Sequence, residues 1–175
     1  MTKPSKKLLA PIVALGAVPL VAIGGSASAS AAGGRAGGRV HVYEVAPSLS
    51  SNVASVVATG AITDYGTNYQ GVAGGGTINK IVFSKGDIEV STAGLTGKPP
   101  TVDPRTCSFK RSLYGTVPIV TGGGTGAYVR ASGTFQVTIK VVGILPVLQS
   151  GGCDETAPPV AGISWVRGVG TVSLN

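Results

Sequence analysis

A glycine-rich stretch at residues 120–133, Val-Thr-Gly-Gly-Gly-Thr-Gly-Ala-Tyr-Val-Arg-Ala-Ser-Gly, constrains the fold of this chain more than any other feature. Glycine adopts positive φ without steric penalty, so such a stretch makes tight corners that regular elements do not need. The runs on both sides of it alternate apolar and polar residues, as the strands of a sheet do. A corner between two strands is therefore predicted. The residues of this structural turn are Gly123, Gly124, Thr125 and Gly126.

The rest of the chain has the pattern of short strands separated by turns. Valine, threonine and isoleucine dominate the runs, 28 glycines and 11 prolines interrupt them, and only 12% of the residues are charged, which is typical of an all-β domain. The expected strands cover residues 39–45, 53–62, 77–84, 87–92, 107–120, 133–143 and 163–174. The expected turns cover residues 66–67, 74–76, 85–86, 97–100 and 157–159. About eight strands fit this pattern, and no segment predicts a helix.

The strand at residues 133–142 indicates how the sheet is buried. Its apolar side chains share one face, and these are Phe135, Val137, Ile139 and Val141. Half-apolar antiparallel strands favour a sandwich or an up-and-down barrel, and long strands with glycine at their bends favour the barrel. We therefore predict an all-β fold, an eight-stranded antiparallel barrel forming a single domain over residues 40–175. A barrel of this size encloses one small ligand, so function is expected at its mouth.

The first 32 residues have the features of an export signal. Lys3, Lys6 and Lys7 precede an apolar run at residues 8–23, and two small-x-small triplets follow at residues 27–31. Cleavage is expected between positions 29 and 32. An uncleaved anchor is the alternative, but two prolines and a glycine interrupt the run, which is shorter than the roughly 20 residues that span a bilayer. The sequence predicts a secreted protein that is not attached to a membrane after signal cleavage.

Residues 33–39, Gly-Gly-Arg-Ala-Gly-Gly-Arg, show no apolar periodicity, and a flexible leader is expected there. The mature chain keeps about 140 residues, which suits one domain. Loss of the three signal lysines lowers the formal net charge from +7 to about +4. The remaining basic residues are scattered and are not interleaved with aromatic residues, so nucleic acid is not expected as a partner.

The two cysteines, Cys107 and Cys153, both lie in the exported part, where thiols oxidise. Because there are only two, one disulfide with a single pairing is predicted. In the chain-entropy model, closing a loop of about 47 residues stabilises a domain by roughly 4 kcal/mol. A reactive thiol is the weaker alternative, because there is no Cys-x-x-Cys motif and the single histidine, His41, would have to serve as its partner.

Residue chemistry alone assigns no catalytic centre. A hydrolytic triad would need His41, and no Gly-x-Ser-x-Gly motif is present. One histidine and two cysteines are too few for zinc, and no acidic loop has the spacing of calcium ligands. The glycine-rich stretch lacks the Lys-Ser/Thr ending of a phosphate-binding loop. Asp87 and Glu89 share one strand face, which predicts solvated acids. We expect no metal and no cofactor.

Several motifs, in their order along the chain, resemble the allene oxide cyclase barrel superfamily, which includes plant dirigent proteins and small secreted bacterial members. The motifs lie at residues 58–66, 83–90, 107, 114–120 and 123–128, before the strand from residue 133. The Gly-Gly-Thr-Gly-x-aromatic turn at 123–128 is the most specific of them. Together they span roughly residues 40–175. The resemblance implies an eight-stranded barrel with a largely apolar cavity, and homo-oligomers like those of the plant relatives.

Members of this superfamily hold an unstable molecule in one conformation. Allene oxide cyclases steer ring closure of a fatty-acid epoxide, and dirigent proteins orient phenoxy radicals made by a separate oxidase. For this chain the resemblance implies a secreted barrel that binds and orients an apolar or phenolic metabolite without metal or nucleophile. Whether it is an isomerase- or dirigent-type enzyme stays open, because the plant site residues do not map onto it position by position. The alternative is a secreted or wall-associated interaction module with a filled barrel and no catalytic activity.

Four polar residues are the candidates for ligand binding at a barrel mouth. Asp64 and Tyr65 lie in the first motif, and Arg111 and Tyr114 lie on the long central strand. The phenols can donate hydrogen bonds, and the guanidinium of Arg111 can hold an oxyanion. In a regular strand Arg111 and Tyr114 lie on opposite faces, so only one of them points inward. The single tryptophan, Trp165, is expected to pack in the core at the barrel floor.

Overall fold

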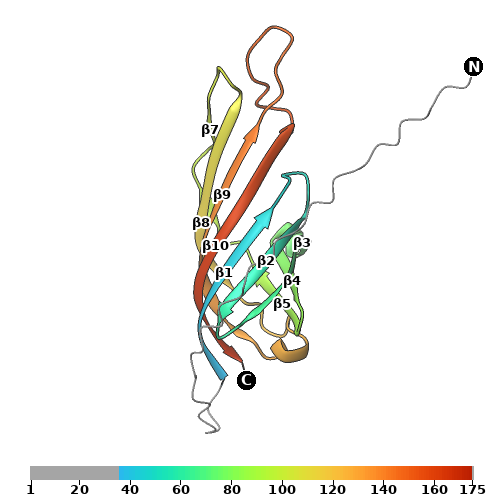
Figure 1. Cartoon of the computed structure of the whole chain (residues 1–175), viewed down its shortest axis with the longest axis vertical. Coiled ribbons are helices and arrows are strands. Elements are labelled where there is room, and N and C mark those ends of the chain that lie inside the picture. Colours follow the sequence, from blue (N-terminus) through green and yellow to red (C-terminus); the bar gives the residue numbers. More distant parts are fainter. Residues whose placement is uncertain (1–35, 175) are drawn as a thin grey trace, which may run out of the picture. The chain divides into compact units, whose positions relative to one another are not determined.

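The computed structural model describes residues 36–174, and the export signal expected at residues 1–32 lies outside them. Within the described range the chain is almost entirely β-structure, with two short 3-10 turns, η1 (Gly74–Gly76) and η2 (Gly126–Tyr128). One antiparallel sheet contains its ten strands (Figure 1): β1 (Ala36–Ala46), β2 (Val53–Gly60), β3 (Asp64–Ala73), β4 (Ile78–Phe83), β5 (Gly86–Ser91), β6 (Thr96–Gly97), β7 (Thr101–Val102), β8 (Ser108–Pro118), β9 (Ser132–Ile144) and β10 (Ala161–Leu174). The all-β prediction is confirmed.

The sheet follows the order β5-β4-β3-β2-β1-β10-β9-β8-β6, and β7 also pairs with β8. β1 pairs with β10 along its whole length, from Ala36 opposite Leu174 to Ala46 opposite Ser164. The first and last strands therefore lie side by side in the middle of the sheet. Residues 36–39, predicted as part of the flexible leader, belong to this pairing.

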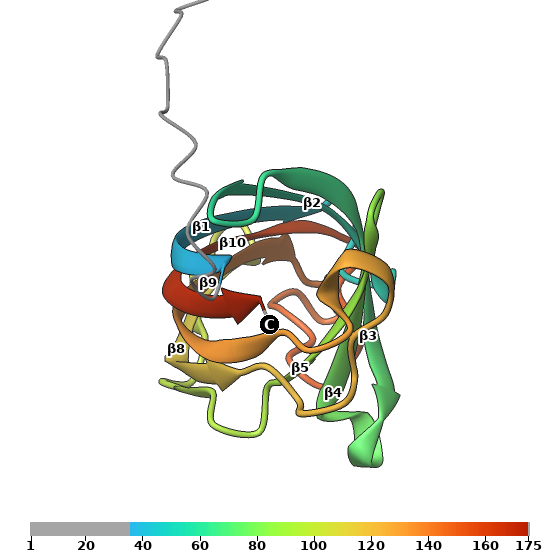
Figure 2. The ribbon, with the colours of Figure 1, turned by 90° about the horizontal axis from the view of Figure 1, so that it is seen from below.

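The sheet curls into a half-barrel (Figure 2) and does not close into the predicted eight-stranded barrel, so that finer prediction is wrong. The short strands β6 and β7 pair with the free edge of β8, and β5 does not reach this part of it. β5 instead meets the segment that follows β8, starting with a bridge between Val90 and Ile119. The two edges of the sheet are therefore joined only at one end.

The glycine-rich stretch forms this junction, which makes it more than a corner. The backbone N–H groups of Thr125 and Ala127 donate to carbonyls of the β4–β5 hairpin at 3.0 and 2.9 Å. Gly126 has a φ of +57°, and a Cβ on it would overlap the backbone carbonyl of Lys85 in this hairpin. Because two backbones approach this closely, no side chain fits between them, and glycine is required.

β3 is a long strand that the sequence did not predict, and residues 66–67, expected in a turn, lie inside it. Its pattern is inverted relative to an ordinary half-buried strand. Tyr65 and Tyr69 are exposed, whereas Asp64 and Asn68 are buried. Because the buried positions are polar, β3 lacks the apolar face by which a half-buried strand is predicted from sequence. This polar strand becomes part of one wall of the candidate site.

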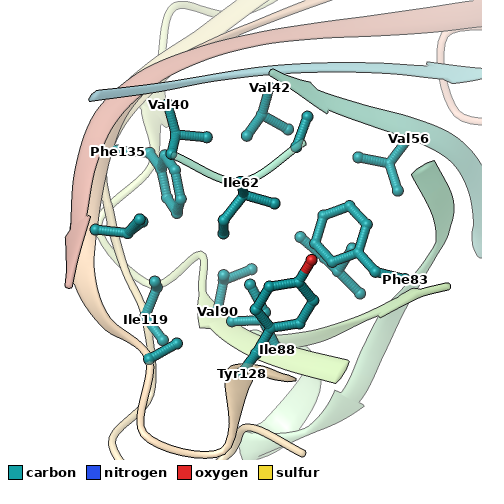
Figure 3. Packing of buried hydrophobic residues seen from close by; sticks show 14 of the residues in the cluster. Val40, Val42, Val56, Ile62, Phe83, Ile88, Val90, Ile119, Tyr128 and Phe135 are labelled. Atoms are coloured by element: carbon teal, nitrogen blue, oxygen red, sulfur yellow. The ribbon is translucent and has the colours of Figure 1, made fainter. Parts of the chain in front are cut away.

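A solid apolar core fills the end of the half-barrel that carries the glycine-rich stretch (Figure 3). Its largest fully buried side chains are Val40, Val56, Ile62 and Ile88. The rings of Phe83 and Tyr128 meet edge to face, with their centroids 5.7 Å apart. The core therefore packs β1, β2 and the β4–β5 hairpin against the segment after β8.

The predicted disulfide between Cys107 and Cys153 is present, with a Cα–Cα distance of 5.2 Å. It ties the start of β8 to the loop between β9 and β10. Cys107, Phe109 and Leu145 form a second, smaller buried cluster, and Leu49 and Val141 pack against it. The disulfide thus stabilises the end of the half-barrel opposite the solid core.

Candidate functional site

Beyond the solid core the half-barrel is hollow. A cavity of about 440 Å³ lies inside the curled sheet. Small-molecule sites in proteins occupy roughly 300–1,000 Å³, so this volume suits one small ligand. The four apolar side chains predicted to share one face all line this cavity: Phe135, Val137, Ile139 and Val141. The face predicted for this strand is therefore confirmed as an interior face.

One side of the cavity is mainly apolar, and the other mixes polar and aliphatic side chains. β8, β9 and β10 supply mainly aliphatic side chains, such as Leu113, Val137 and Val166. β1, β3 and β4 supply the polar side chains of Glu44, Asn68, Gln70 and Asn79. This division suits a ligand with an apolar body and one polar end.

Glu44 on β1 and Asn68 on β3 form the polar centre of the cavity. The Asn68 amide Nδ2 donates to Glu44 Oε2 at 2.8 Å, and the two residues are only 2% and 7% exposed. On β2, between them, the residue opposite Asn68 is the small Ala54, which leaves room for the pair to meet. Burial raises the pKa of the Glu44 carboxyl, and the hydrogen bond from Asn68 offsets only part of this increase.

The amide oxygen of Asn68 has no hydrogen-bond partner, although it is buried. In the described part of the chain the only other such buried side-chain atom is Nδ1 of His41, which lies on the opposite face of β1 from Glu44. Buried polar atoms in folded proteins are nearly always hydrogen-bonded, because leaving one unpaired costs about 1–3 kcal/mol. An unpaired acceptor inside a cavity is therefore a position at which a ligand donor binds favourably.

Neither residue of this pair was predicted as a site residue from the sequence. β1 has two alternating faces, one with Val42 and Glu44 and the other with His41 and Tyr43, and alternation alone does not say which is buried. Asn68 lies in β3, which was not predicted as a strand. The available signal was a single acid on the more aliphatic face of a strand, since a buried acid is rare without a function or a partner.

Asp64, a candidate from the sequence, is buried outside this cavity and is fully hydrogen-bonded. Its carboxylate accepts from the Ser84 hydroxyl at 2.5 Å, from the Tyr128 phenol at 2.7 Å, and from the backbone N–H groups of Tyr65, Ser84 and Lys85. Burial raises the pKa of Asp64, but these hydrogen bonds outweigh it and lower the pKa to about 2. Burial and the neighbouring carboxylate raise the pKa of Tyr128. This network joins β3, the β4–β5 hairpin and η2.

The other three candidates do not meet one another. Tyr65 and Tyr114 lie on the outer face and are 70% and 57% exposed. Arg111 is paired with Val141, a cavity residue, but is exposed and does not line the cavity. Trp165, expected in the core, is 40% exposed on the outer face of β10, so that prediction is wrong. The register of β9 and β10 explains this exposure. Trp165 lies opposite Lys140, and because the neighbours of Lys140 in β9 face the cavity, Lys140 and Trp165 both face outward.

Among residues 36–174 no three His, Cys, Asp or Glu side chains are grouped as metal ligands, and no helix is long and apolar enough to cross a membrane.

Comparison of the chain with models of known families, with curated proteins and with solved structures finds no match. The resemblance to allene oxide cyclases and dirigent proteins therefore rests on the sequence motifs, and function must be argued from the cavity.

Proposed function

We propose that this protein is a small-molecule-binding half-barrel that holds and orients one mostly apolar ligand, in the manner of the allene oxide cyclase and dirigent proteins that its motifs resemble. The observation that supports this proposal is the cavity of about 440 Å³ with an apolar wall and a single buried acid–amide pair. Ligand sites are typically apolar with a few polar groups that fix orientation. Here Glu44 and Asn68 fix the polar end of the ligand.

The lining favours orientation over covalent chemistry. It contains three serines and one threonine, but none of its residues is a histidine, cysteine or lysine that would activate a nucleophile. Holding a reactive molecule in one conformation needs only shape and a few hydrogen bonds. A ring closure or coupling directed by the apolar wall is the reaction class that this lining supports.

Binding of the apolar fluorophore N-phenyl-1-naphthylamine tests the proposal. Val137 faces the cavity and its neighbour Thr138 faces outward, so Val137→Trp fills the site and Thr138→Trp is a matched control. We expect wild type and the Thr138 variant to enhance fluorescence equally and the Val137 variant to lose at least tenfold in affinity. Equal binding by all three proteins would contradict the proposal, because the fluorophore would then bind elsewhere.

We also propose that the protein acts outside the cytoplasm. The disulfide between Cys107 and Cys153 supports this location, because such bonds persist in oxidising compartments. Expression of the full chain in a secreting host, followed by N-terminal sequencing of the exported product, tests it. The mature protein is expected to begin within residues 30–33. An unprocessed product that stays with the cells would refute export.

The outer face of the sheet supports a second candidate function, an interaction module in which two copies of the chain associate. Tyr43 on β1, Val57 on β2 and Trp165 on β10 are exposed on neighbouring strands, and aromatic residues are enriched at protein interfaces. Light scattering tests it: wild type is expected to dimerise, Trp165→Ser to be monomeric, and Tyr114→Ser, farther along the sheet, to behave as wild type. A monomeric wild type would exclude this candidate.

A further inference from the structure

The polar centre of the cavity presents hydrogen-bond acceptors to a ligand. Asn68 Oδ1 is buried without a partner, and its amide Nδ2 is already used in the bond to Glu44 Oε2. The carboxyl group of Glu44 accepts that one bond and retains further lone pairs. A ligand that satisfies this site must therefore bring hydrogen-bond donors.

The charge of the lining restricts the ligand further. Among the lining residues, all in the described part of the chain, Glu44 is the single ionisable side chain, and none is Lys, Arg or His. On the surrounding strands the other ionisable residues of the inner face are Asp64, which is bound by Ser84 and Tyr128, and Arg111, which is exposed. A carboxylate or phosphate in the cavity would find no counter-charge and would meet Glu44. A cation would find a carboxylate that no basic residue neutralises.

We propose that the ligand of this cavity is a protonated amine with an apolar body, its ammonium group placed between the Glu44 carboxylate and Asn68 Oδ1. This inference rests on the proposed small-molecule binding and names the ligand class. An ammonium group is compact and carries three donors, enough for both acceptors. Its hydrocarbon or aromatic body lies against the aliphatic side chains of β8, β9 and β10.

Burial without a cationic partner raises the pKa of Glu44 in the empty protein, and a bound ammonium favours its ionised form. Binding of the amine at a pH where the empty site is partly protonated therefore releases protons from Glu44. A neutral alcohol of the same length releases none. This difference gives a readout that simple filling of the cavity does not produce.

A matched ligand series tests the proposal by isothermal titration at pH 7: hexylammonium, 1-hexanol and hexanoate, which differ only in the head group. Hexylammonium is expected to bind at least tenfold more tightly than 1-hexanol, and hexanoate to bind more weakly than both. Glu44→Gln, which keeps the size of the side chain and an acceptor for Asn68, should remove the preference for the amine and retain 1-hexanol binding. Glu155→Gln, at an exposed acid outside the cavity, is the control and should bind as wild type.

Each outcome separates this inference from the proposed function. Equal affinity for amine and alcohol, tighter binding of hexanoate, or an unchanged preference in the Glu44 variant overturns the amine assignment. Binding of N-phenyl-1-naphthylamine without binding of hexylammonium also overturns it while the cavity remains a ligand site. If neither the fluorophore nor any member of the series binds, the proposed small-molecule function itself fails.

Discussion

Replacing Asp64 by asparagine removes the charge at the centre of the network that joins three segments of the fold. In the native protein its pKa is about 2, against 3.8 for a free aspartate side chain. At roughly 1.4 kcal/mol per pH unit, this difference corresponds to a stabilisation of about 2 kcal/mol at neutral pH. Because the folded pKa is the lower one, the stabilisation is complete above pH 5 and is lost as pH falls through 4 towards 2. Asp64→Asn should therefore unfold about 2–4 kcal/mol more easily at pH 7.

Urea unfolding of both proteins at pH 7, 5, 3 and 2 measures this effect. The difference in free energy of unfolding between wild type and Asp64→Asn should shrink by about 2 kcal/mol between pH 5 and pH 2. Glu155→Gln, which removes an exposed acid, should follow the wild-type curve. A constant difference between wild type and Asp64→Asn over this range would show that the hydrogen bonds of Asp64 do not stabilise its ionised form, and would refute the structural role assigned to it.

Three other features of the structure also predict measurable changes in stability. Gly124→Ala should destabilise by about 1–3 kcal/mol in urea unfolding, because its Cβ would overlap a backbone carbonyl of η2; Gly168→Ala, where a Cβ would make only ordinary contacts of 3.5 Å or more, should cost less, and the reverse order would contradict the close approach. Reduction of the Cys107–Cys153 disulfide should lower the free energy of unfolding by about 2–4 kcal/mol, measured with and without reductant; no change would exclude a stabilising bond. The stability of Glu44→Gln relative to wild type should increase as pH rises from 4 to 8. Burial raises the pKa of Glu44 in the folded protein, so ionisation of this carboxyl at higher pH destabilises wild type. A difference in stability that does not depend on pH would contradict a buried carboxyl without a compensating charge.

The sequence predicts the long strands well because most of them obey one rule. β8, β9 and β10 alternate apolar and polar residues, and the predicted ranges overlap the observed ones closely. β3 breaks the rule, because its inner residues are polar and its outer residues are tyrosines. β6 and β7 are too short to give any periodicity. Closure was predicted from the long strands with glycine at their bends, whereas β6 and β7 occupy the part of the β8 edge that a closed barrel needs.

The candidate site was less predictable than the fold for a related reason. Strand periodicity identifies two faces but not which of them is interior when both carry apolar residues, as in β1. Glu44 was therefore not distinguished from a solvated acid, and Trp165 was assigned to the core on its size alone. The glycine-rich stretch was recognised as important, but the need for glycine comes from its contact with the β4–β5 hairpin. Local sequence patterns do not predict contacts of this kind between distant segments.

Two buried acids on inner faces of this sheet show how structure separates a stabilising group from a binding group. Asp64 receives five hydrogen bonds, its pKa is lowered, and it has no unmet need for a partner. Glu44 receives one hydrogen bond from an amide whose own oxygen is unpaired, and its pKa is raised. The hydrogen bonds of Asp64 stabilise the empty protein. The Glu44–Asn68 pair destabilises it, because an acceptor stays unpaired, and a ligand with hydrogen-bond donors removes this penalty. The acid that destabilises the empty fold is therefore the one to which function is assigned.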